Sequence, residues 1–231
     1  MQGPGGRWFF PSSGAILAVI VAVGFAPSFY LPGVLEPAVS QPAYIVLHGI
    51  ALTLWYLLFL VQTLLVSTGR VRLHRSLGMF GAGLALVVFA LSMVVVVRSV
   101  PHFAARGASD LGIAIPVLGD FALLLLFGVL VAAGIRLRRK PEAHKRVMLI
   151  GSIGIVAPAL ARWPGAGAHL PPTVVVPQLV LCTALVAYDL ATIRRVHKAT
   201  IWSVAGYVVA SGVSVGLAFS QAGQRLVHAL R

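Results

Sequence analysis

The sequence predicts an all-α membrane protein, a polytopic bundle of about seven transmembrane helices. Three observations support this fold. The 231-residue chain is 59% hydrophobic, with a mean hydropathy of +0.96. Charged residues make up only 10% of it, whereas they make up roughly 25% of ordinary soluble domains. Several apolar stretches also approach the length of about 20 residues that a membrane helix needs. A soluble protein of this length could not bury so much apolar surface, so we expect lipid to cover it.

Seven apolar stretches follow one another, separated by short segments. The expected spans are Ser13–Tyr30, Pro42–Val66, Leu77–Val97, Leu111–Ile135, Lys145–Ala161, Pro172–Ile193 and Ala199–Phe219. The third, fifth and seventh each follow a basic segment in which a His precedes Lys or Arg: Gly69–Arg75 (GRVRLHR), Arg136–Arg146 (RLRRKPEAHKR) and Arg194–Lys198 (RRVHK). Residues 1–12 form an N-terminal segment, residues 13–219 a single transmembrane domain with its core at 43–164, and residues 220–231 a polar tail expected to be interfacial or loose.

The basic residues predict the direction of the chain. If the N-terminus is cytoplasmic, most of the 18 Lys and Arg residues lie inside: Arg7, Arg70, Arg72, Arg75, Arg136, Arg138, Arg139, Lys140, Lys145, Arg146, Arg194, Arg195 and Lys198. The remainder lie outside: Arg98, Arg106, Arg162, Arg225 and Arg231. Because cytoplasmic loops are enriched in Lys and Arg, we expect the N-terminus inside and the C-terminus outside.

Two alternative interpretations of the basic residues are less consistent with the sequence. Arg7 followed by the apolar run Ala15–Phe25 resembles a cleaved signal peptide, but a small-x-small cleavage site is missing and Pro27 and Pro32 follow. The net charge of +13 would suggest a nucleic-acid partner in a soluble protein. Here short loops between spans hold the charge, so we expect no nucleic-acid binding.

Two successive helix pairs repeat one pattern. When the second and third spans are aligned with the fourth and fifth, His74 matches His144, and His48 lies at the depth of Asp120. Two like-oriented hairpins predict a four-helix core with a pseudo-two-fold axis along the membrane normal. His74 and His144 would then lie at equal depths near the cytoplasm. Gln62 follows His48 by two seven-residue steps, so both are expected to face the bundle interior.

His74 and His144 are candidate axial ligands of one b-type haem iron. Low-spin haem iron takes two axial side chains, and helices facing each other across a bundle can supply one imidazole each. The haem propionates need cations, and the sequence offers Arg70, Arg72, Arg75, Lys145 and Arg146. Candidate aromatic walls are Trp55, Phe59 and Phe80.

The alternative is that these histidines and their basic neighbours only face lipid headgroups, as is common at the cytoplasmic ends of membrane helices. The third basic segment, RRVHK, supports this alternative. A pattern that occurs before three spans is expected of a signal for membrane topology.

A second polar group is expected near the outer side: His48, Asp120, Arg162 and His169. A membrane-embedded Asp near an Arg is either a neutralised structural pair or part of a proton or substrate path. Histidine titrates near pH 6.5, which suits a relay. On the sixth span, Asp189 is expected to form an interfacial salt bridge with Arg194 and Arg195. Soluble-enzyme motifs such as HExxH, a Walker loop or GxSxG are missing from the sequence.

Part of the chain, roughly Ala43–Pro164, resembles a bacterial family of predicted multi-pass membrane proteins that is defined only as a domain of unknown function. The resemblance rests on Leu47-His48-Gly49, on Gln62, on the box LHR-x-LG at residues 73–78, on the box HKR-x-M at residues 144–148, and on Arg162. It implies a location in the bacterial inner membrane and no particular activity.

The LHR-x-LG box is also similar to that of the four-helix di-haem cytochromes b, which include ferric reductases. In that superfamily, His pairs on the second and fourth helices and on the third and fifth helices hold the haems. The similarity implies that His74 and His144 match the third/fifth pair and that His48 matches the second-helix ligand. Asp120 stands where the fourth-helix His is expected, which argues against an outer haem.

Together these observations give three hypotheses of function. The preferred one is electron transfer through one b-type haem near the cytoplasmic side, held by His74 and His144 with Arg75 and Lys145, and linked to quinone or another redox partner. The second is a haem-free transporter or sensor of protons or small molecules that uses the outer cluster. The third is a structural or assembly subunit.

Overall fold

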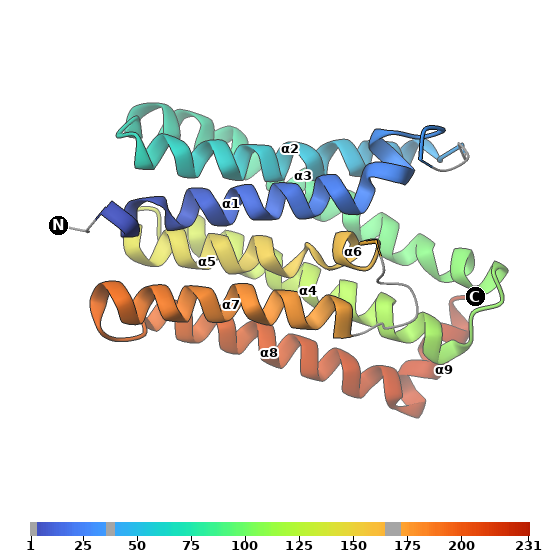
Figure 1. Cartoon of the computed structure of the whole chain (residues 1–231). Helices are drawn as coiled ribbons and strands as arrows, with labels where there is room; N and C mark the ends of the chain where they lie inside the picture. The colour runs from blue at the N-terminus through green and yellow to red at the C-terminus, as the bar shows by residue number, and fades with distance from the viewer. Residues whose placement is uncertain (1–3, 36–39, 165–171) are drawn as a thin grey trace.

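The computed structural model describes residues 4–35, 40–164 and 172–231, and its elements form one bundle of helices that run side by side (Figure 1). The elements are α1 (Pro4–Phe25), a π-helical turn η1 (Ala26–Tyr30), α2 (Ala43–Ser67), α3 (Val71–Ala105), α4 (Asp110–Arg136), α5 (Pro141–Gly154), α6 (Ala157–Leu160), α7 (Pro172–Ile193), α8 (Lys198–Phe219) and α9 (Gln221–Ala229). Within the described part, six helices are long and apolar enough to cross a membrane. The chain is therefore an all-α, multi-pass membrane protein, as predicted.

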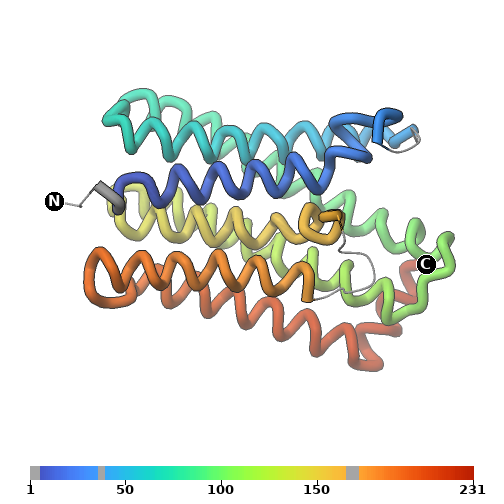
Figure 2. The backbone as a smooth tube through the Cα atoms, in the orientation of Figure 1, coloured from blue at the N-terminus to red at the C-terminus, as the bar shows by residue number. Residues whose placement is uncertain are grey.

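The two ends of the bundle differ in which connections they carry. The start of α1 and the α2–α3, α4–α5 and α7–α8 connections lie at one end, and the C-terminus lies at the other (Figure 2). All three basic segments of the sequence belong to the first end. We call it the basic end, and the other the opposite end.

Helices α2 to α5 form the core of the bundle. Consecutive helices pack against each other, and hydrogen bonds to Ser152 close the ring between α2 and α5. Tyr56 donates its hydroxyl to the Ser152 carbonyl at 3.0 Å, and Trp55 Nε1 donates to Ser152 Oγ at 3.3 Å. Across the diagonal, the rings of Trp55 and Phe127 meet edge to face with centroids 5.1 Å apart. This aromatic layer joins α2, α4 and α5.

The remaining helices surround this core. Helix α1 packs against α2, α5 and α6, and α8 packs against α4 and α5. The tail that was expected to be interfacial or loose instead forms α9. Ser220 Oγ caps that helix by accepting the Gly223 N–H at 3.1 Å. Arg231 Nε holds its end to Asp110 of α4 at 3.0 Å. Helix α1 also begins at Pro4, well before the expected start of the first span at Ser13.

The expected fifth span is broken into α5 and α6. Helix α5 ends at Gly154, and α6, which contains Pro158, starts at Ala157. The break leaves helix carbonyls to be satisfied by other donors, as apolar surroundings require. Gln178 of α7 provides them: its Nε2 donates to the carbonyls of Ile153 and Gly154 at 2.8 and 3.1 Å, and its Oε1 accepts the Tyr207 hydroxyl at 3.1 Å.

Candidate functional site

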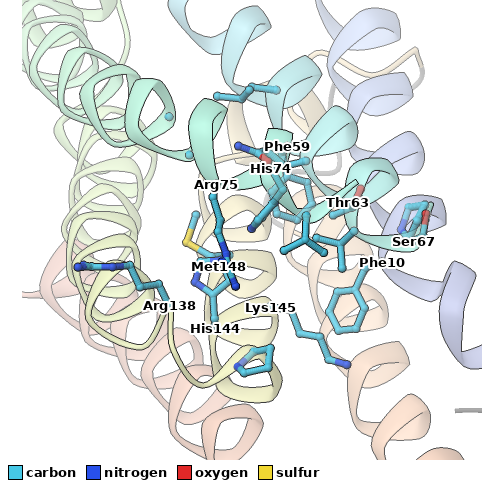
Figure 3. Close-up of a pocket in the computed structure, with 18 of the residues that line it drawn as sticks. Phe10, Phe59, Thr63, Ser67, His74, Arg75, Arg138, His144, Lys145 and Met148 are labelled. Carbon is cyan, nitrogen blue, oxygen red and sulfur yellow. The ribbon is translucent and has the colours of Figure 1, made fainter. Parts of the chain in front are cut away.

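A large cavity lies between α1, α2, α3, α4 and α5 at the basic end of the bundle (Figure 3). Its volume is about 1560 Å³, which exceeds the roughly 300–1,000 Å³ typical of small-molecule pockets. We call it the inner cavity. Its polar and aromatic lining residues include Arg7, Phe10, Trp55, Phe59, Gln62, Thr63, Ser67, His74, Arg75, Arg138, Arg139, Glu142, His144 and Lys145.

His74 and His144 meet inside the inner cavity. The tandem repeat predicted equal depths for them, and their ring centroids lie 6.2 Å apart with the ring planes at 82° to each other. His74 projects from α3 and His144 from α5, the two helices on one diagonal of the four-helix core (Figure 3). The two imidazoles therefore approach each other across the bundle rather than along one helix surface.

The second nitrogen of His144 is fixed by the backbone. Nδ1 of His144 lies 2.8 Å from the carbonyl oxygen of Gly134 on α4. A carbonyl can only accept, so Nδ1 carries the proton and donates, which leaves Nε2 as the lone-pair nitrogen. Metal-binding histidines are oriented in this way by a second hydrogen bond.

Two buried polar atoms in the same cavity have no hydrogen-bond partner among the described residues. They are Nδ1 of His74 and Oε1 of Gln62. Gln62 faces the interior, as its position two heptads from His48 predicted. Both atoms are closed off from solvent in this structure, where unpaired polar atoms are costly.

The cations that the sequence offered for an acidic ligand fall into three groups. Arg75 and Lys145 line the inner cavity. Arg70 and Arg72 do not line it. Arg146 was wrongly expected to serve here, because it is fully buried on the other side of α5. Lys145 is only partly available, since its Nζ also lies 2.9 Å from Glu142 Oε1 and 5.0 Å from the centroid of the Phe10 ring.

Two of the three expected aromatic walls are present. Trp55 and Phe59 are buried and line the inner cavity. Phe80 does not line it: its side chain is 59% exposed on the outer surface of α3. The cavity wall on α3 is instead made of small residues, Gly78, Gly81 and Ala82.

Arg146 belongs to a buried ion pair that sequence reasoning missed. Its Nε and Nη2 donate to Asp189 Oδ1 at 2.9 and 2.5 Å, and neither side chain is exposed. Asp189 Oδ2 accepts from Thr200 Oγ1 at 2.5 Å and from the His197 N–H at 2.9 Å. Asp189 therefore does not form the expected interfacial salt bridge with Arg194 and Arg195. Arg194 and Arg195 lie in the segment before α8, whereas the Asp189 side chain points inward to α5.

Glu142 completes this network at the start of α5. Its carboxylate contacts Arg146 Nη1 at 2.7 Å and Lys145 Nζ at 2.9 Å. Burial opposes its ionisation, but the hydrogen bonds from Lys145 and Arg146 outweigh burial and hold the pKa of Glu142 below its usual range.

His197, from the third basic segment, has a different role from His74 and His144. Its Nδ1 accepts the Ala199 N–H at 3.0 Å and so caps the first turn of α8. Burial and the nearby Arg146 guanidinium lower the pKa of His197, which favours the neutral ring that this acceptor role needs. The three His-Lys/Arg segments are thus similar in sequence but not in use: one histidine caps a helix and two line a cavity.

The outer polar cluster is loosely assembled. His48 Nδ1 lies 3.4 Å from Ser92 Oγ. Arg162 Nη1 donates to the Pro158 carbonyl at 2.8 Å, and its guanidinium lies 5.0 Å from the centroid of the Phe25 ring. Among the described residues, Asp120 and Arg162 do not form a direct salt bridge. His169 lies outside the described residues.

No group of three or more His, Cys, Asp or Glu side chains within residues 4–35, 40–164 and 172–231 could hold a metal ion. Comparisons with family models, curated proteins and solved structures found no match.

Proposed function

We propose that this membrane protein transfers electrons through one b-type haem bound in the inner cavity between His74 and His144. The observation that supports the proposal most strongly is the 6.2 Å separation of the two imidazole centroids in a cavity of about 1560 Å³. When bound, such a group takes up and returns single electrons at its iron.

The separation of the rings suits two axial ligands. A coordinating imidazole nitrogen lies about 2 Å from a metal, and its ring centroid about 1 Å further, so two imidazoles on opposite sides of one iron have centroids about 6 Å apart. The 6.2 Å spacing of His74 and His144 agrees with this value. The hydrogen bond from His144 Nδ1 to Gly134 would hold that ring in the orientation that presents Nε2.

The surroundings of the two rings suit a flat, apolar cofactor with acidic side groups. Trp55, Phe59 and Met148 offer apolar walls, and Arg75 and Lys145 offer cations on α3 and α5. Hydrogen bonds from such cations to a carboxylate are roughly twice as strong as hydrogen bonds between neutral groups. The small residues of α3 leave the room that a macrocycle needs, because a larger side chain at Gly78 would project toward Gln62 and the cavity.

We further propose that the basic end faces the cytoplasm of a bacterial cell and that a quinone of the bilayer, or another redox partner, exchanges electrons with the haem. The excess of Lys and Arg at this end supports the orientation.

The experiment is a reduced-minus-oxidised visible spectrum of detergent-purified protein that was expressed with a haem supply. We expect a sharp α-band of the b type and about one haem per chain. His74→Ala and His144→Ala should each abolish the band. His48→Ala is the matched control and should retain it, because His48 lies outside the inner cavity. A wild-type protein without the band would refute the proposal.

A second candidate function, transport or sensing, would use the outer cluster. The observation in its favour is the polar contact inside the bundle between His48 Nδ1 and Ser92 Oγ, at 3.4 Å. Transport also requires a polar path from that cluster to Gln62, and the aromatic layer of Trp55 and Phe127 lies between them. Loss of uptake or efflux of a radiolabelled substrate in Asp120→Asn, with haem content unchanged, would favour this function instead.

A further inference from the structure

Between α3 and α4, near the basic end, the inner cavity is lined by residues that also face the surface of the bundle. The two helices meet closely at Gly128, where an added Cβ would lie 3.0 Å from the ring of Phe89. Nearer the basic end, Met79 of α3 and Ile135 of α4 line the cavity although 78% and 37% of their surface is exposed. Residues that belong both to the cavity wall and to the lipid-facing surface mark a lateral opening.

Three arginines stand at this opening. Arg75 follows the first turn of α3, and Arg138 and Arg139 follow α4. Figure 3 labels Arg75 and Arg138. Among the described residues, none of them has an acidic partner; Arg138 Nη1 donates only to the Ile135 carbonyl, at 3.3 Å. The neighbouring lining residues are apolar: Met79 and Ala82 on α3, and Val131 and Ile135 on α4.

We propose that this opening, the α3–α4 groove, binds one anionic membrane phospholipid, with its phosphate at the arginines and an acyl chain along the apolar walls. Charge complementarity identifies the occupant. Guanidinium groups match the geometry of phosphate oxygens. Basic pockets between transmembrane helices on the cytoplasmic side are known to bind acidic headgroups. An acidic lipid also places an apolar chain beside Met79 and Ile135, which a free inorganic anion cannot do.

The inner cavity has room for this lipid in addition to a haem. Its volume of about 1560 Å³ is larger than a single ligand usually occupies. Arg138 and Arg139 follow α4 and are not used by the haem proposal, which shares only Arg75 with the lipid site. The lipid site does not depend on haem, and it can be tested on protein without haem.

The test is native mass spectrometry of the delipidated full chain, titrated with phosphatidylglycerol and with phosphatidylcholine of the same acyl chains. We expect one phosphatidylglycerol to bind at least about tenfold more tightly than phosphatidylcholine. The double variant Arg138→Gln/Arg139→Gln should weaken phosphatidylglycerol by about thirtyfold, because two arginine contacts are lost.

The matched control is Arg70→Gln/Arg72→Gln. It removes the same charge from the same end of the bundle, but neither residue lines the inner cavity. This control should bind as the wild type does. Ala82→Phe, which fills the groove without changing charge, should weaken both lipids. If both double arginine variants weakened phosphatidylglycerol binding equally, or if the two lipids bound with equal affinity, binding would reflect general surface charge. Either result would overturn the site. Displacement of the lipid by inorganic phosphate alone would also overturn it.

Discussion

Arg146 of α5 and Asp189 of α7 are joined by two hydrogen bonds, of 2.9 and 2.5 Å, and neither side chain reaches the surface. The pair ties α5 to α7 and, through Thr200 and the His197 N–H, to the start of α8. Arg146 follows His144 by only two residues. The ion pair therefore anchors the turn of α5 that also presents His144 to the inner cavity.

Removing one member of this pair should be strongly destabilising. Asp189→Leu leaves a buried guanidinium with Glu142 as its remaining charged partner, and breaking a buried pair costs about 3 kcal/mol or more. We expect the thermal midpoint in detergent to fall by roughly 6 to 12 °C. Arg195→Gln, which removes an exposed arginine nearby, is the control and should leave the midpoint unchanged. The double variant Arg146→Met/Asp189→Leu should recover most of the loss. A midpoint unaffected by Asp189→Leu would contradict this role.

Replacing Gln178 should also destabilise the protein, because its side-chain amide donates to carbonyls at the break between α5 and α6. Gln178→Leu leaves the Gly154 carbonyl and the Tyr207 hydroxyl without the Gln178 amide, whereas the Ile153 carbonyl keeps the Val156 N–H at 3.3 Å. Each buried unsatisfied group costs about 1 to 3 kcal/mol, so we expect a loss near 3 kcal/mol in thermal or denaturant unfolding. Tyr207→Phe removes only the hydroxyl and should cost about 1 kcal/mol. Equal losses in the two variants would show that Gln178 does not support the break.

The carboxylate of Glu142 should make stability depend on acid pH. Its pKa is lowered in the folded protein. The stabilisation is therefore fully present above the unfolded-state pKa, near 4.5, and is lost as pH falls through the lower folded value. Glu142→Gln should flatten the decrease of the thermal midpoint below that pH and should cost about 1 kcal/mol or less at neutral pH, because half-exposed ion pairs contribute little. An identical acid profile in the variant would exclude Glu142 as the titrating group.

The sequence predicted the all-α bundle because hydropathy alone identifies stretches that need lipid. It also identified His74 and His144 as residues at the same end, since a tandem repeat constrains depth. It did not predict the break after Gly154, because Pro158 alone does not reveal that Gln178, far along the chain, supplies the missing donors. A polar residue inside an apolar span was the available signal.

The predicted partner of Asp189 was wrong for a related reason. Arg194 and Arg195 are close to it along the chain, and Arg146 is distant. Only the packing of α5 against α7 and α8 brings Arg146 to the carboxylate. Similarly, Phe80 looked like a cavity wall by its closeness to His74, but it lies on the outward surface of α3. Neighbours in sequence were poor guides wherever helix rotation decided the contact.

The proposal of one haem between His74 and His144 is tested most directly by the electron paramagnetic resonance spectrum of the oxidised protein. If His74 and His144, whose ring centroids lie 6.2 Å apart, both held the haem iron, the oxidised protein would give a low-spin ferric signal. We predict that signal in the wild type, and its replacement by a high-spin signal in His144→Ala. A wild-type spectrum that is only high-spin, or the absence of any haem signal, would contradict the account.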